Sequence, residues 1–173
     1  MPIIGSETDL TLNLAARHSA IDDGLKNMPG GEVYYAPVED SATGTIEFVE
    51  LPCSDLGTQV EGARLVFRDG VVVDASAREG EDHLLQTLET DSGSRGVGEF
   101  GLGCNEGLTR SLGDPLFDEK IAGTIHLALG GSYTHIGGRN ESRIRWDLVK
   151  DLRRDGGLWC DGELVQQGGR WCI

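Results

Sequence analysis

Residues 61–77 read EGARLVFRDGVVVDASA. Within this segment, ARLVF (63–67) and VVVDASA (71–77) are apolar, β-prone runs. They flank Asp69-Gly70, a dipeptide typical of the two-residue turn of a β-hairpin. The segment predicts the clearest hairpin of the chain and favours a fold in which antiparallel strands dominate.

Further strand-like segments lie on both sides of this hairpin, with alternating side chains or apolar runs between glycine-rich and polar loops. The predicted strands are residues 11–17, 32–37, 45–51, 125–129 and 144–149. A terminal hairpin is predicted over residues 157–171, with Asp161-Gly162 as its turn. Short helices are predicted over residues 80–89 and 116–122.

Glycine is unusually frequent, with 26 residues in a chain of 173. The glycines from 93 to 107, including those of GEFGLG (98–103), are interpreted as turn glycines. The predicted fold class is therefore α+β, a mostly antiparallel, glycine-rich β-sheet with a few short helices. No linker is evident, so residues 1–173 are expected to form a single domain.

The formal net charge of −14 disfavours binding to nucleic acid and to anionic membranes, because both carry negative charge. The amino terminus has no secretory pattern. Cys53, Cys104, Cys160 and Cys172 form no CxxC pair, and we expect mostly buried thiols. These features together predict a cytoplasmic protein.

A few polar residues interrupt apolar or glycine-rich segments and are therefore candidates for metal binding. His126 interrupts the apolar strand IHLAL, where an unpaired imidazole would be costly to bury. Asp147 interrupts the apolar pattern of IRWDLV in the same way, and Glu99 lies between glycines. From spacing alone His126 is either a core histidine with one backbone hydrogen bond or a metal ligand. A mixture of carboxylate and imidazole suits divalent metals, but spacing does not establish that these residues converge.

Three segments resemble the aminopeptidase T family of metallopeptidases. NMPGGEVYYAP (27–37) is similar to one family segment, and LFDEK (116–120) followed by HLALG (126–130) and Tyr133 is similar to the second. GGRNES (137–142), running into IRWD (144–147), is similar to the third. The segments occur in the family's order, and the resemblance is to its carboxy-terminal, metal-bearing part. Family enzymes place another domain ahead of this part, so the chain is either a stand-alone form or a fragment.

The resemblance carries the family's metal ligands onto individual positions. They fall on Glu32, Glu99, His126, Tyr133 and Asp147. A further family histidine falls on Arg145, which has no lone pair for a metal and adds a positive charge. Arg145 is expected either to disfavour a second metal or to bind a substrate carboxylate, and His135 is a candidate substitute ligand. Tyr133 is expected to act as a ligand or to stabilise an oxyanion.

The resemblance implies a metal-dependent hydrolase that removes amino-terminal residues from peptides, using zinc, cobalt or manganese. The first alternative is a single-metal, non-haem iron dioxygenase, because the domain also resembles ring-cleaving dioxygenases that act on dihydroxypyridines. Such a site needs two histidines and one carboxylate and therefore depends on His135. The second alternative is a repurposed, non-catalytic homologue, because the expected histidine is Arg145. The resemblance also implies a homodimer, which would cover exposed sheet edges.

Overall fold

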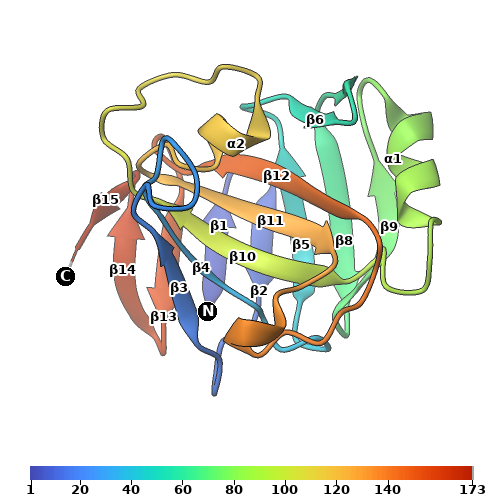
Figure 1. Cartoon of the computed structure of the whole chain (residues 1–173), viewed down its shortest axis with the longest axis horizontal. Coiled ribbons are helices and arrows are strands. Elements are labelled where there is room, and N and C mark those ends of the chain that lie inside the picture. The colour runs from blue at the N-terminus through green and yellow to red at the C-terminus, as the bar shows by residue number, and fades with distance from the viewer. Residues whose placement is uncertain (173) are drawn as a thin grey trace.

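The structure is a computed structural model, and it describes residues 1–172. The larger of its two main sheets contains β1 (Pro2–Gly5), β2 (Thr8–Thr11), β5 (Thr43–Phe48), β8 (Ala63–Arg68), β9 (Val71–Ser76), β13 (Gly157–Cys160), β14 (Glu163–Gln167) and β15 (Arg170–Trp171). These eight strands are ordered β15-β14-β13-β1-β2-β5-β8-β9. The sheet joins the chain's amino-terminal hairpin to its carboxy-terminal strands, since β1 pairs with β13 (Figure 1).

The second sheet has five strands and carries the candidate site. It contains β3 (Ser19–Asp22), β4 (Glu32–Tyr35), β10 (Val97–Gly103), β11 (Thr124–Gly130) and β12 (Arg145–Asp151), in the order β12-β11-β10-β4-β3. A separate hairpin is formed by β6 (Cys53–Asp55) and β7 (Thr58–Val60), and the helices are α1 (Glu81–Leu88), α2 (Pro115–Asp118) and the 3-10 turn η1 (Thr134–Ile136). The pairings between these strands are antiparallel, as predicted.

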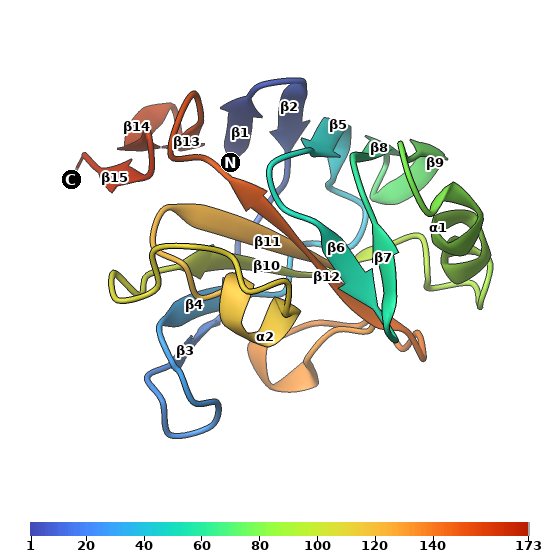
Figure 2. The ribbon, with the colours of Figure 1, turned by 90° about the horizontal axis from the view of Figure 1, so that it is seen from above.

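The two sheets lie one above the other, with their inner faces forming the core (Figure 2). Phe100 of β10, Leu127 of β11 and Leu148 of β12 belong to the same buried cluster as Ile46 of β5 and Leu65 of β8. Because side chains alternate along a strand, the residues next to these three project from the opposite face of the second sheet. That outer face is partly covered by α2, which packs against β12.

The hairpin predicted over residues 61–77 is confirmed as β8 and β9. Asp69 has φ of 50° and Gly70 has φ of 82°, as the two central residues of a tight hairpin turn require. The strands predicted at 32–37, 45–51, 125–129 and 144–149, the terminal hairpin and the helix at 80–89 are also found, with shifted ends.

Two secondary-structure predictions were wrong. The strand predicted at 11–17 lies earlier, as β2 (Thr8–Thr11), and the chain then leaves the sheet and adopts φ of 58° at Ala16. Residues 98–103 are not turns but part of the fully buried strand β10. The glycines there make room for neighbouring atoms: a Cβ on Gly101 would lie 2.0 Å from His126 Cε1, and one on Gly103 would lie 2.0 Å from the Ile121 carbonyl oxygen.

The expectation of mostly buried thiols was also wrong. Cys53 is buried, whereas Cys104, Cys160 and Cys172 are exposed, and the four cysteines are free. The exposed three lie at strand ends or beyond them, where side chains face solvent. Within residues 1–172, no helix is both long enough and apolar enough to cross a bilayer.

The contact between Gly101 and His126 gives a first prediction. Gly101→Ala should lower the free energy of unfolding by about 1–3 kcal/mol, because the added methyl must displace a fully buried imidazole or its strand. It should also weaken binding of a divalent metal at His126, an expected ligand, measured by calorimetry. Gly5→Ala is the matched control, because a Cβ there meets its neighbours at 3.7 Å, an ordinary contact. Equal melting curves for the two variants would contradict this account.

Candidate metal centre

The site is built on the outer face of the second sheet by strand pairing. Ala128 of β11 pairs with Glu99 of β10 on one side and with Asp147 of β12 on the other. Gly101 pairs with His126 in the same sheet, and Gly103 pairs with Glu32 of β4. Directly paired residues project from one face, so the register brings four polar side chains from four strands to one side of the sheet.

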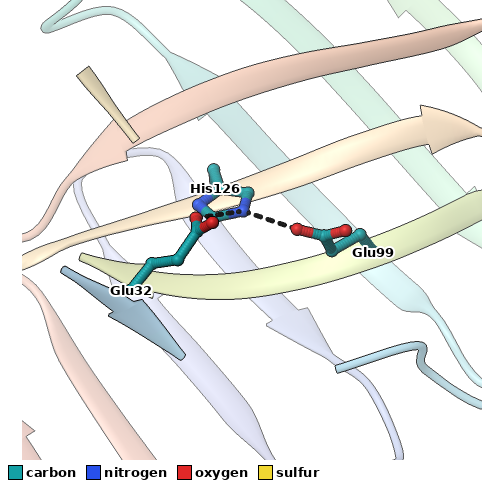
Figure 3. A group of neighbouring side chains, drawn as sticks. All are labelled: Glu32, Glu99 and His126. Atoms are coloured by element: carbon teal, nitrogen blue, oxygen red, sulfur yellow. Dashed lines mark hydrogen bonds and ion pairs between the residues drawn. The ribbon is translucent and has the colours of Figure 1, made fainter. Parts of the chain in front are cut away.

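Three of these side chains converge. Glu32, Glu99 and His126 point toward one another from β4, β10 and β11 (Figure 3). The His126 Nε2 atom lies 3.0 Å from Glu99 Oε1 and 3.6 Å from Glu32 Oε2. His126 has no exposed surface, and Glu32 and Glu99 are 5% and 2% exposed.

A second group of close donor atoms shares the same imidazole. It consists of Glu119, His126 and Asp147, whose donor atoms lie within 4.8 Å of one another, as do those of Glu32, Glu99 and His126. Glu119 follows directly after α2, a turn that begins at Asp114, where the carboxylate accepts the Leu116 N–H at 3.0 Å. The short turn therefore places the Glu119 carboxylate against the outer face of the sheet, beside His126 and Asp147.

Lys120 is buried within the site and was missed by the sequence analysis, as was any role for Glu119. The Lys120 ammonium has no exposed surface and donates to Glu32 Oε1 at 2.6 Å and to Glu119. It also lies 3.8 Å from Asp22 Oδ2. Both residues belong to the LFDEK segment, but nothing in a short polar run indicates that a lysine will be buried among carboxylates.

Arg145 is the second cation that contacts the carboxylates of the site. Its Nη2 donates to Glu99 Oε2, and its Nε lies 4.0 Å from Asp147 Oδ2. The guanidinium also stacks over the Tyr133 ring, 3.9 Å from the centroid. Arg145 therefore places a permanent positive charge between Glu99 and Asp147, two of the candidate ligands.

His135 does not join either group of donors. It lies on η1, it is exposed, and its ring packs 5.3 Å from that of Tyr133. Both residues line the cavity beside the site, which has a volume of about 340 Å³. Tyr133 contributes an aromatic wall that is 38% exposed.

The electrostatics of the site follow from an excess of carboxylates. Burial raises the pKa of Glu119 to about 7, despite its hydrogen bond from Lys120. Burial alone would lower the pKa of His126, but the hydrogen bond to Glu99 and the surrounding carboxylates raise it to about 9. Burial also raises the pKa of Asp147. The raised pKa values mean that these groups keep their protons more readily, because the carboxylates of the site outnumber its cations.

Unpaired atoms in the site fit a divalent cation. Glu32 Oε2, Asp147 Oδ1 and His126 Nδ1 are buried and lack hydrogen-bond partners among the described residues. Buried carboxylate oxygens without a partner are costly, and a cation satisfies them. Carboxylate oxygen together with imidazole nitrogen is a donor set that zinc and similar metals accept.

Known proteins show the same combination of fold and sequence. Residues 2–171 match the family described as thermophilic metalloprotease (M29). The chain belongs to the M29 family. Aminopeptidase AmpS of Bacillus subtilis is 35% identical to it, over 96% of this chain and 47% of AmpS. Aminopeptidase T of Thermus thermophilus is 31% identical, over 98% of this chain and 48% of its own length.

The chain thus spans about half the length of the M29 relatives that it matches. The solved structure of wild-type AmpT from Thermus thermophilus has a TM-score of 0.85 at 28% identity, over 99% of this chain and 49% of that one. The resemblance to the aminopeptidase T family is therefore confirmed. A 2,5-dihydroxypyridine dioxygenase from Pseudomonas putida KT2440 has a TM-score of 0.77 at 16% identity, over 98% and 54% of the two chains, which shows a shared fold alone.

Proton release on metal binding gives a second prediction. At pH 6, His126 with a pKa of about 9 is protonated, and a cation that binds its nitrogen must expel this proton. The apparent Kd for zinc should therefore fall as pH rises from 6 to 8, by roughly 100-fold, since each displaced proton gives about a factor of ten per pH unit. Titration calorimetry in buffers of different ionisation enthalpy counts the protons. A Kd that does not change with pH would contradict the raised pKa of His126.

Proposed function

We propose that this chain is the metal-binding part of an aminopeptidase that removes amino-terminal residues from peptides. The observation that carries the proposal is the convergence of Glu32, Glu99, Glu119 and Asp147 around His126 in a member of the M29 family. Relatives over nearly the whole chain bear the name aminopeptidase, which supports the same activity. We infer that residues 1–173 form one domain equivalent to the carboxy-terminal part of aminopeptidase T.

The proposed ligands of the metal are Glu32, Glu99, His126 and Asp147. Zinc, cobalt or manganese would suit these donors, and a bound divalent cation lowers the pKa of water and polarises a carbonyl group. His126 is held in place by the Gly101 backbone beneath its ring and by Glu99 beside it. The fixed imidazole and the strand-borne carboxylates would form a rigid donor set.

The pocket itself favours an amino-terminal group. Its walls include Asp22, Glu32, Glu99, Glu119 and Asp147. Arg145 and the exposed Lys26 also line the pocket, and Lys120 pairs with Glu32 beside it. The five carboxylates therefore outnumber the three cations, and the excess of negative charge would attract the α-ammonium group of a peptide. The cavity volume of about 340 Å³ suits a small group rather than a folded partner.

Glu119 is the proposed proton carrier. A carboxyl group whose pKa is about 7 can accept a proton from the attacking water and return it to the leaving amine near neutral pH. The hydrogen bond from Lys120 fixes the position of this carboxyl group at the pocket wall. Tyr133 and Arg145 also line the pocket, and we propose that they face the carbonyl side of the substrate.

The direct test of this function is release of free amino acids from short peptides. Purified protein loaded with zinc, cobalt or manganese should release amino-terminal residues, and removal of the metal with a chelator should abolish the reaction because the nucleophile is lost. Chromatography of the products identifies the residue released. If the rate of amino-acid release with each of the three metals is no higher than that of the chelated sample, the proposal is wrong.

Glu119→Gln tests the proton carrier. The amide cannot accept the proton, so kcat should fall by about 10²–10⁴-fold while metal content, measured by elemental analysis, stays at the wild-type level. Glu163→Gln is the matched control, because Glu163 is an exposed glutamate on β14, outside the pocket. Loss of the metal in Glu119→Gln would show that Glu119 is a ligand instead of the proton carrier.

The iron dioxygenase alternative gains no support from the donor groups. Within residues 1–172 both groups contain His126 as their single histidine, and His135 lies outside them. The alternative of a non-catalytic homologue would follow from a negative hydrolysis assay. A homodimer, expected from the family, stays a prediction that light scattering can check, and so does a cytoplasmic location.

A further inference from the structure

The positive charge of Arg145 lies between two carboxylates, Glu99 and Asp147, that would otherwise need another cation. Glu99 and Asp147 flank Ala128, one on each side across the paired strands. Ala128 has only a methyl side chain, so the space above it lies between the two carboxylates. The Arg145 guanidinium reaches into that space and donates to Glu99, and its Nε lies 4.0 Å from Asp147.

We propose that Arg145 takes the place of a second metal ion, so that this chain binds one divalent cation per molecule. The inference rests on the proposed metal centre and adds its stoichiometry and the residue that sets it. Arg145 cannot lose its proton at ordinary pH, so its charge stays in the site under all relevant conditions.

The donor atoms support a single ion. Glu99 Oε2 already accepts from Arg145, which leaves Oε1, beside His126, as the one Glu99 oxygen for a metal ion. The buried carboxylate oxygens without a hydrogen-bond partner, among the described residues, are Glu32 Oε2 and Asp147 Oδ1. The two donor groups also share one imidazole, and a neutral imidazole has a free lone pair on one nitrogen only, so it supplies a nitrogen ligand to one ion.

The charges support the same conclusion. The carboxylates of Asp22, Glu32, Glu99, Glu119 and Asp147 face two fixed cations, Lys120 and Arg145. Three negative charges therefore remain when all five are ionised. One divalent cation leaves the site with a small negative charge, whereas two would make a buried site positive, with a dication beside the guanidinium.

The test is the metal content of the wild-type chain and of Arg145→His. Each protein is saturated with zinc and freed of excess, and zinc per chain is measured by elemental analysis and native mass spectrometry. The wild type should hold one zinc ion. Arg145→His should hold two, because the substitution removes a positive charge and supplies a nitrogen donor between Glu99 and Asp147.

Arg153→His is the matched control. Arg153 forms an ion pair with Asp151 at 2.7 Å and does not line the cavity of the candidate site. This variant should keep one zinc ion, which would exclude a general effect of added histidine. Circular dichroism before and after zinc addition checks that each variant is folded.

A cobalt titration of the wild type keeps the test decisive if Arg145→His does not fold. The visible absorption of bound cobalt should saturate at one equivalent. A wild type that binds two ions would overturn the role of Arg145 while leaving the metal centre intact, and so would a folded Arg145→His that binds one. A wild type that binds no zinc or cobalt would overturn the proposed function itself, and the inference with it.

Discussion

The buried imidazole of His126 is the constraint on which the candidate site depends. It lies on the outer face of the five-stranded sheet, without exposed surface, among carboxylates that come from four other segments of the chain. An imidazole in this position can be tolerated only because Glu99 pairs with it and because Gly101 leaves space for its ring. Gly101 and His126 are paired across neighbouring strands, so the absence of a side chain at Gly101 leaves the space that the His126 ring occupies.

Charge balance explains the rest of the arrangement. Lys120 and Arg145 bind different carboxylates of the cluster, the first Glu32 and Glu119 and the second Glu99. Each cation satisfies part of the carboxylate cluster, but neither reaches Glu32 Oε2 or Asp147 Oδ1 among the described contacts. The raised pKa values of Glu119, Asp147 and His126 express the same deficit of positive charge. A divalent cation would relieve this deficit without requiring the site to retain protons.

The five-stranded sheet packs into the core with its inner face and carries the candidate ligands on its outer face. Phe100, Leu127 and Leu148 project inward and join the core between the sheets, while the residues beside them along the same strands project outward. The core therefore fixes the position of the site residues without contact with solvent or substrate. The short segment after α2 adds Glu119 and Lys120 from above, which is the only part of the cluster that does not come from a strand of this sheet.

The sequence by itself determined the hairpin at residues 61–77, the antiparallel character of the sheets and the candidates Glu32, Glu99, His126 and Asp147, because turn dipeptides, alternation and motif order are local features. It did not reveal that GEFGLG is a buried strand, since glycine favours turns unless neighbouring side chains need its empty volume. The burial of Lys120, the position of Glu119 and the contact of Arg145 with Glu99 were decided by the tertiary structure alone. These contacts join residues that lie up to 88 positions apart, as in Lys120 and Glu32, and only strand register and the packing of α2 bring them within reach of each other.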